Sequence, residues 1–325
     1  MHIVVAINEP SFWTLPAGEA ERLSEMLPDD VIVHVRDAAA LRAALPDADV
    51  LFATHLTVEG LRRAGRLRWM HSSAVGIGNL MFPEFVASPV SLTNSRDLHA
   101  EPIAEHALAL MLAVRRQIHV AAARQHEHVW AQREIYRRLT TPLDRSTLAV
   151  IGLGAIGSRI VRLGLGLGMR VVGVRKRIET PAPAGLAETF PAGRLHEALA
   201  VADAVVLAVP HTPDTERMMG AAEFAAMRPG AVFVNVARGQ LVDHDALVAA
   251  LAAGRLAGAA LDAFVPEPLP TASPLWDLPN LLITPHTAAF GIDYWRPAVG
   301  LFVENVHRFR AGEPLVNLVD KARGY

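Results

Sequence analysis

Short apolar runs alternate with amphipathic stretches along the first third of the chain. The amphipathic stretches repeat apolar residues at intervals of three and four, which is typical of helices that pack on one side. The apolar runs resemble buried parallel strands. This alternation predicts a parallel sheet with helices between its strands. The five expected strands are residues 2–7, 31–35, 50–53, 69–71 and 90–93.

The same alternation continues from residue 147 onward. It predicts a second parallel sheet, doubly wound, with helices on both faces, so the fold class is α/β. The six expected strands are residues 148–151, 170–174, 204–209, 231–236, 257–261 and 281–284.

Helical patterns connect the two regions. Residues 100–126 carry apolar residues at helical spacing and predict one long helix that bridges the two regions. Residues 288–311 predict a helix that is kinked or restarted at Pro297 and returns the chain to the first region. Residues 130–141 form a polar connection, in which we expect Trp130 to pack on the surface rather than to face a substrate or a second subunit.

A glycine motif follows the first strand of the second region. Gly152, Gly154 and Gly157 have G-x-G-x-x-G spacing between an apolar strand and a helix. The first glycine permits a tight turn, the second lets backbone approach a pyrophosphate, and the third brings helix against strand. Glycines also mark ordinary turns, but the strand before the motif and the helix and strand after it favour dinucleotide binding.

The next strand ends in three cations, Arg175, Lys176 and Arg177. An acidic residue at this place would bind the adenosine ribose hydroxyls, whereas arginine accommodates a 2′-phosphate. A solvated basic loop is the alternative. Because the glycine motif fixes the position of this strand end, we favour NADP over NAD.

Composition narrows the class of protein. The chain has 325 residues, of which 51% are hydrophobic and 20% charged, as in an ordinary globular protein. The net charge of −2 gives no reason to expect nucleic acid as a partner, and the absence of cysteine excludes disulfides and thiol nucleophiles. No segment resembles a secretion signal or a membrane span, so we expect a cytoplasmic protein.

Two features of the first 106 residues are candidates for ligand binding. The loop at residues 72–79 contains Gly76 and Gly78, which leave backbone amides open to an anion such as a carboxylate, although an ordinary turn is as good an interpretation. Glu105 and His106 are adjacent, but two ligands make a metal site improbable, and we expect local hydrogen bonding instead.

Four polar residues at or near the later strand ends form the candidate chemical site. Ligands of doubly wound sheets collect beyond the carboxyl ends of the strands. Arg238 can hold a carboxylate through two parallel hydrogen bonds, and a histidine paired with a carboxylate is a general acid near neutral pH. The four residues are Arg238, Asp262, Glu267 and His286.

Several segments resemble the D-isomer-specific 2-hydroxy acid dehydrogenase family. They are GLGAIGSRI, VNVARGQLVDHDAL, GAALDAFVPEPLP and ITPHTAA, with SSAVGIGN and NSRDLHAEPIAEHALALML resembling the substrate loop and interdomain helix of the family. The resemblance covers nearly the whole chain. It implies two Rossmann-like lobes with a deep interdomain cleft, usually in a homodimer. Residues 1–98 plus 289–325 would form the substrate domain and residues 99–288 the dinucleotide-binding domain.

The resemblance also implies roles for individual residues. Arg238 would bind the substrate carboxylate and polarise the ketone, His286 would deliver the proton, and Glu267 would pair with His286. The amides of Val75 and Gly76 would bind the substrate carboxylate, and Asp262 would lie beside the nicotinamide. The residues expected to contact the cofactor are Gly152, Gly154, Ala155, Ile156, Gly157, Arg175, Lys176, Arg177, Pro210, His211, Thr212, Ala237, Arg238, Asp262, His286 and Ala288.

The chain departs from the family pattern at three positions. Arg175 replaces the usual acidic residue, Gly78 stands where many relatives have aspartate, and Ala289 replaces a frequent glycine. Glu267 argues against the related formate dehydrogenases, which have glutamine there. Phosphite oxidation and a dinucleotide-sensing corepressor-like binding module remain alternatives to an enzyme that reduces 2-keto acids.

The expected reaction is NADPH-dependent reduction of a small 2-keto acid. Glyoxylate, hydroxypyruvate and phenylpyruvate are the candidate substrates. Trp130, Tyr294 and Trp295 are candidates for shaping the side-chain pocket, although we expect the last two to be core or interface residues.

Overall fold

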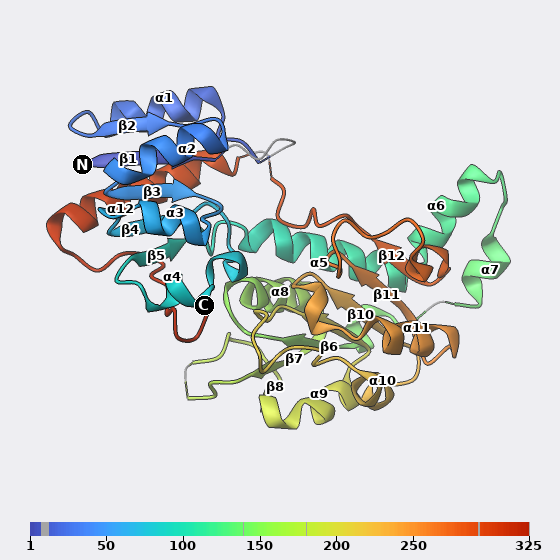
Figure 1. The fold of residues 1–325 in the computed structure, drawn as a ribbon. Coiled ribbons are helices and arrows are strands. Elements are labelled where there is room, and N and C mark those ends of the chain that lie inside the picture. Colours follow the sequence, from blue (N-terminus) through green and yellow to red (C-terminus); the bar gives the residue numbers. More distant parts are fainter. Residues whose placement is uncertain (8–12, 139, 180, 292, 325) are drawn as a thin grey trace. The chain divides into compact units, whose positions relative to one another are not determined.

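The computed structural model describes residues 1–7, 13–138, 140–179, 181–291 and 293–324 (Figure 1). The chain divides into two compact units. The first comprises Met1–His99 together with Gly291–Tyr325, and the second comprises Ala100–Phe290. The second unit is therefore an insertion within the first.

The first unit contains a parallel five-stranded sheet in the order β2-β1-β3-β4-β5. All five strands expected from the sequence are present, with ends that differ by at most one residue. This order is that of flavodoxin-like doubly wound sheets. The strands are β1 (His2–Ala6), β2 (Val31–His34), β3 (Val50–Ala53), β4 (Trp69–Ser72) and β5 (Ser91–Asn94).

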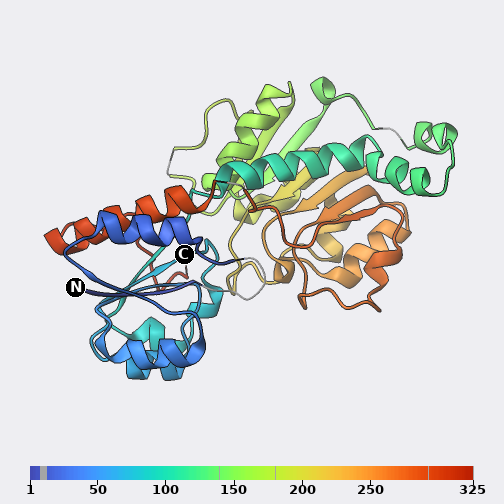
Figure 2. The same ribbon diagram turned by 90° about the horizontal axis from the view of Figure 1, so that it is seen from above.

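Helices cover both faces of this sheet, as Figure 2 shows. Successive strand residues point to opposite faces, so Ile3 packs under one layer and Val4 under the other. Helices α1 and α12 lie side by side over the face that contains Ile3. The helices of this unit are α1 (Ala17–Met26), α2 (Ala38–Ala44), α3 (Val58–Arg63), α4 (Pro83–Ala87) and α12 (Trp295–Ala311).

The second unit contains a parallel sheet in the order β12-β11-β10-β9-β6-β7-β8. This order extends the 3-2-1-4-5-6 arrangement of dinucleotide-binding folds by one strand. The strands are β6 (Thr147–Ile151), β7 (Arg170–Arg175), β8 (Glu188–Pro191), β9 (Ala204–Leu207), β10 (Ala231–Asn235), β11 (Leu256–Leu261) and β12 (Leu281–Ile283).

The expectation of six strands in this sheet was wrong, because β8 is a seventh. This strand lies at the edge, only Phe190 among its residues is buried, and it ends in proline. An edge strand needs neither a long apolar run nor a full set of amide donors. Its sequence therefore carried no strand signal.

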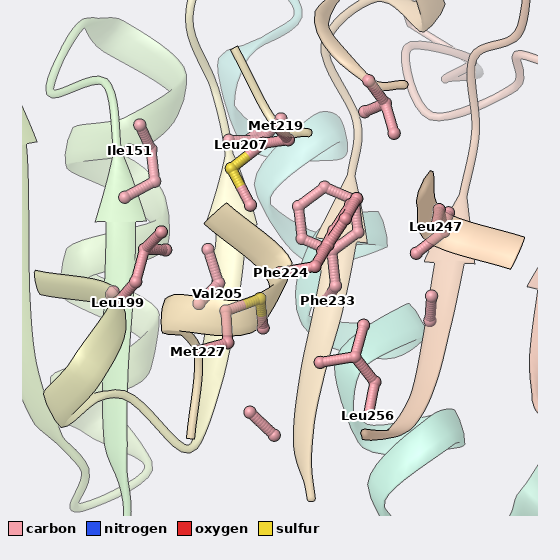
Figure 3. Close-up of a cluster of buried hydrophobic side chains, with 14 of the residues drawn as sticks. Ile151, Leu199, Val205, Leu207, Met219, Phe224, Met227, Phe233, Leu247 and Leu256 are labelled. Atoms are coloured by element: carbon pink, nitrogen blue, oxygen red, sulfur yellow. The ribbon is translucent and has the colours of Figure 1, made fainter. Parts of the chain in front are cut away.

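The two faces of the second sheet have separate cores. Helices α5 and α8 pack on one face, and α9, α10 and α11 supply side chains such as Leu199, Phe224 and Leu247 to the other, which Figure 3 shows. The bounds of these helices are α5 (Ala100–Arg115), α8 (Ala155–Gly166), α9 (Leu195–Val201), α10 (Ala221–Ala226) and α11 (His244–Ala252).

The prediction of one long helix over residues 100–126 was also wrong. Helix α5 ends at Arg115, Gln117 adopts a left-handed φ of 56°, and α6 (Ile118–His126) starts a new direction. The amide of the Gln117 side chain donates to the carbonyl of Val114, which helps to end the first helix. No glycine or proline marks this break, so periodicity could not show it.

Helix α6 and the short α7 (Gln132–Tyr136) form an arm that stands out beyond the sheet of their unit in Figures 1 and 2. The expectation that Trp130 packs on the surface was wrong, because 89% of this residue is exposed at the tip of the arm.

Pro297 does not kink the last helix. Within the described part of residues 288–311, helix α12 begins at Trp295, so Pro297 lies in its first turn, where a missing amide donor costs nothing. No helix among the described residues combines the length and apolar character that crossing a membrane requires.

Candidate functional site

The glycine turn connects β6 to α8 with little room for side chains. Gly152 has a φ of 99°, and a Cβ atom there would lie 2.5 Å from the carbonyl oxygen of Ala208. A Cβ atom on Gly157 would lie 1.8 Å from the carbonyl oxygen of Gly152, whereas one on Gly154 would meet nothing within 4 Å. The first and third glycines are thus required by packing, and the second leaves the turn open to a ligand.

Helix α8 begins at Ala155 directly after this opening. The amides of Ala155 and Ile156 belong to the first turn, whose donors have no acceptor within the helix. The positive end of the helix dipole adds to their attraction for an anion. This arrangement suits a pyrophosphate.

The basic segment lies at the carboxyl end of β7, as the sequence predicted. Arg175 is half-buried and donates from Nη1 to the carbonyl of Pro181 at 3.0 Å, while Lys176 and Arg177 are exposed. Lys176 Nζ lies 2.7 Å from Asp214 Oδ2, in the segment after β9. Arg175 and Lys176 therefore already contact protein oxygens.

The segment after β9 forms a closed turn. Thr215 Oγ1 accepts from the amide of Thr212 at 2.8 Å and donates to the carbonyl of Pro210 at 2.8 Å. His211 is hydrogen-bonded to Glu216. These bonds hold the backbone at Pro210, His211 and Thr212 in one conformation.

Arg238 follows β10 and is held by its backbone. The buried Asn235 accepts from the amide of Ala237 at 3.0 Å and donates to the carbonyl of Arg238 at 2.9 Å. Burial lowers the pKa of Arg238, and the charges of Glu267 and Asp262 oppose this effect. A half-buried guanidinium with two carboxylates near it is a suitable anchor for an anionic substrate.

Close backbone packing fixes the residue after Arg238. A Cβ atom on Gly239 would lie 2.2 Å from the carbonyl carbon of Phe264. Only glycine fits this approach between the segments that carry Arg238 and Glu267.

His286 and Glu267 form the pair expected from the sequence. His286 Nδ1 lies 2.7 Å from Glu267 Oε2, and the amide of Phe264 donates to Glu267 Oε1 at 2.7 Å. Burial would raise the pKa of Glu267, but the hydrogen bonds from His286 and from the amide of Phe264 outweigh it and lower this pKa. Because Nδ1 faces the carboxylate, Nε2 is the nitrogen of His286 that remains to exchange a proton with a substrate.

Asp262 follows β11 and is 1% exposed. Its Oδ1 atom accepts from Thr284 Oγ1 at 2.6 Å and from the amide of Thr287 at 2.9 Å, and its Oδ2 atom accepts from the amide of Ala288 at 3.0 Å. Burial would raise the pKa of Asp262, but hydrogen bonds from His106, Thr284 and the two amides outweigh it and lower this pKa. The Asp262 side chain therefore contacts the segment that carries His286 and also His106 on α5.

In the first unit, the loop after β4 contains Val75 and Gly76, both half-buried. Asn94 donates from Nδ2 to the carbonyl of Val75 at 2.8 Å. Ser73 precedes these residues, and its Oγ atom accepts from Trp13 Nε1 at 3.1 Å. The Tyr294 hydroxyl donates to the carbonyl of Ser73.

The structure thus brings four predicted residues to the carboxyl ends of three neighbouring strands in one sheet: Arg238, Asp262, Glu267 and His286. Val75 and Gly76 belong to the other unit. Tyr294 is 7% exposed and stacks on His99 with ring centroids 4.3 Å apart, which agrees with a core position rather than a substrate-facing one.

Sequence reasoning missed the residues that support the site. Asn235 is a polar side chain at the last position of a buried apolar strand, and this unusual placement was its only signal. His106 does make hydrogen bonds, but its partner Thr284 is 178 residues away rather than local. No pattern within one element could have shown that contact.

Comparison with known proteins identifies the family. Residues 108–288 match the model described as D-isomer specific 2-hydroxyacid dehydrogenase, NAD binding domain. A D-3-phosphoglycerate dehydrogenase from Mycobacterium tuberculosis is 33% identical over 89% of this chain, although the chain spans only 54% of that relative. A glyoxylate reductase from Thermococcus gammatolerans is 32% identical over 91% of this chain and 87% of its own length.

A solved structure agrees over both units. The NADPH-dependent glyoxylate/hydroxypyruvate reductase from Sinorhizobium meliloti, in complex with NADP and sulfate, is 27% identical. It covers 100% of this chain, which covers 99% of it, with a TM-score of 0.84. The chain belongs to the D-isomer specific 2-hydroxyacid dehydrogenase family and is an NAD(P)-dependent enzyme of that family.

Proposed function

We propose that this enzyme reduces a small 2-keto acid of the glyoxylate, hydroxypyruvate or phenylpyruvate class to the D-2-hydroxy acid, with NADPH as the preferred cofactor. The observation that carries this proposal is the His286–Glu267 pair, at 2.7 Å, beside Arg238 on the sheet that bears the glycine turn. A cation for the carboxylate and an acid for the ketone oxygen are the two groups that this reduction requires.

Each of these residues has a separate role in substrate binding or proton transfer. Arg238 binds the substrate carboxylate with two N–H donors and turns the ketone carbon toward the cofactor site. The amides of Val75 and Gly76 bind the same carboxylate from the substrate domain, residues 1–98 plus 289–325. When bound in the dinucleotide domain, residues 99–288, the nicotinamide supplies a hydride. His286 Nε2 gives a proton to the ketone oxygen, and the Glu267 carboxylate stabilises the ring in both protonation states.

Steady-state kinetics with NADPH and NADH across glyoxylate, hydroxypyruvate and phenylpyruvate tests this function. We expect turnover of at least one keto acid and a higher kcat/KM with NADPH. Cofactor binding without turnover of any keto acid would instead favour a binding module, and turnover of phosphite alone would favour phosphite oxidation.

The preference for NADPH rests on the basic end of β7. Arg175 occupies the place at which an acidic residue would bind the ribose hydroxyls, and residues 174–178 include neither Asp nor Glu. The solved relative from Sinorhizobium meliloti carries NADP. A 2′-phosphate would offer Arg175 a charge-assisted bond in place of its bond to the carbonyl of Pro181, and it would compete with Asp214 for Lys176.

Replacing Arg175 with aspartate is expected to lower kcat/KM for NADPH by about tenfold or more, because one charged phosphate contact is lost. The ratio of kcat/KM values for NADPH and NADH is the measurement. Arg170→Asp, at the amino end of the same strand, is the matched control and should leave this ratio unchanged. An unchanged ratio in R175D would remove Arg175 from the cofactor site.

We also infer that two copies of the chain form a homodimer through the arm of α6 and α7. Val129, Trp130 and Tyr136 are 50%, 89% and 77% exposed, and large apolar side chains grouped in this way mark an interface. A second copy is the partner that is present wherever the chain is present, and closed dimers are the commonest soluble assemblies.

Trp130→Asp is expected to convert the dimer into monomers at micromolar concentration, because a buried charge would lack a partner. Light scattering during size-exclusion chromatography measures the mass. Trp276→Asp, which changes a half-exposed tryptophan outside the arm but in the same unit, should leave the dimer intact. A wild-type monomer, or a dimer that persists in W130D, would contradict the assignment of this interface.

A further inference from the structure

Three side chains form a hydrogen-bond chain beneath the segment that carries His286. Thr284 Oγ1 donates to Asp262 Oδ1 at 2.6 Å, and His106 Nε2 lies 3.0 Å from Thr284 Oγ1. The only hydrogen of the Thr284 hydroxyl already goes to Asp262, so His106 must be the donor to Thr284. This assignment places a proton on Nε2 of His106, which also lies 3.5 Å from Asp262 Oδ1.

Asp262 forms hydrogen bonds with residues on both sides of His286 in the sequence. Its carboxylate accepts from the Thr284 side chain before His286 and from the amides of Thr287 and Ala288 after it. Asp262 is 1% exposed, so water does not compete for these bonds.

The backbone at His286 needs such support. Its φ of 54° lies in the left-handed region, which costs a non-glycine residue of order 1–3 kcal/mol and persists only where the surroundings impose it. The imidazole meets Glu267 from this conformation. A relaxed backbone would turn the ring away from its partner.

We propose that His106 is a positioning residue that, through Thr284 and Asp262, holds His286 in the left-handed conformation required for proton delivery. This role rests on the proposed function, in which His286 is the proton donor. This role differs from a hydrogen bond that only provides a partner for a polar side chain of α5. The hydrogen bonds continue through Asp262 to the two backbone amides that follow His286.

His106 lies near the point where the polypeptide enters the second unit. Helix α5 starts at Ala100, where the chain enters the second unit, and the His286 segment ends shortly before Phe290, where it leaves. His106 therefore links the entering segment to the leaving segment.

Paired substitutions test the proposal in the full-length enzyme. His106→Leu and Thr284→Val remove the hydrogen-bonding groups, whereas His106→Gln keeps an N–H donor near the Nε2 position and Thr284→Ser keeps the hydroxyl. We expect kcat to fall about tenfold in H106L and T284V, because a small displacement of a catalytic group costs this much or more. The KM for the keto acid and the Kd for NADPH should change less than about twofold, since Arg238 and the glycine turn are untouched.

Conservative variants that keep the hydrogen-bonding groups distinguish a positioning role from a general loss of protein stability. H106Q and T284S should recover most of the lost kcat, because each restores the hydrogen-bonding group that its partner variant removes. His196→Leu, a surface histidine paired with Glu223, is the matched control and should be silent. An unchanged kcat in H106L, or equal losses in H106L and H106Q, would overturn the proposal.

Amide hydrogen exchange tests the positioning role of His106 independently of the proposed function. The amides of Thr287 and Ala288 should exchange faster in H106L and T284V than in the wild type, whether or not the keto acids are substrates. If the wild type turned over none of them, the proposed function would fail while faster exchange still supported the positioning role. Unchanged exchange at both amides would overturn that role.

Discussion

Replacing His286 with alanine is expected to lower kcat for 2-keto acid reduction by about 10²–10⁴-fold, the range that a positioned general acid contributes. The variant keeps Arg238 and the glycine turn but has no group that can give a proton to the ketone oxygen. Glu267 cannot take over, because its lowered pKa leaves it ionised at neutral pH. Single-turnover reduction at saturating NADPH measures this effect.

The Kd for NADPH and the KM for the keto acid distinguish this role from a binding role. Both should change little in H286A, since the loss falls on the transition state rather than on the bound reactants. His307→Ala, which removes an exposed histidine on α12, serves as the control for unspecific effects. Losses of equal size in kcat and in cofactor affinity would refute the acid role of His286.

Replacing Arg238 with methionine is expected to reduce kcat/KM by about a thousandfold, since two charge-assisted hydrogen bonds of about 1.5–3 kcal/mol each are lost. Most of the loss should appear in KM, because the carboxylate is present in substrate and transition state alike. The charges of the nearby Glu267 and Asp262 would then lack a compensating cation. Kinetics over a wide range of keto acid concentration separates the two constants.

Arg238→Lys tests geometry apart from charge. Lysine keeps one positive charge but cannot present two parallel donors, so R238K should recover only part of the activity. Full recovery would mean that charge alone binds the carboxylate. A small effect of both substitutions on KM would place the carboxylate elsewhere, with the amides of Val75 and Gly76 as the first positions to examine.

Prediction of the fold succeeded where burial fills a strand on both faces. Strand β9 is apolar at every position and β6 at every position after Thr147, because parallel strands of a doubly wound sheet are covered on both sides. Prediction of the fold failed where the local sequence pattern does not determine the structure. The edge strand β8 needs little burial, and the break at Gln117 depends on one left-handed residue that has no sequence signature.

The candidate site shows the same division. His286, Glu267 and Arg238 could be predicted, because each follows a recognisable strand and belongs to a recognisable segment. Thr284 and His106 could not, since their function depends on partners that only the folded sheet brings together. Asn235 was missed although its partners, Ala237 and Arg238, are only two and three residues away. Hydrogen bonding across strands is set by register, which the residues of one strand do not encode by themselves.

Because the second unit is inserted within the first, the second unit can fold before the first during synthesis. One face of the first sheet, which contains Ile3 and Phe52, is covered by Phe302 and its neighbours on α12. The ribosome delivers α12 only after the whole inserted unit. Residues 100–290 can therefore complete their core first, and the unit that starts the chain finishes last, with its apolar face exposed to chaperones in the meantime.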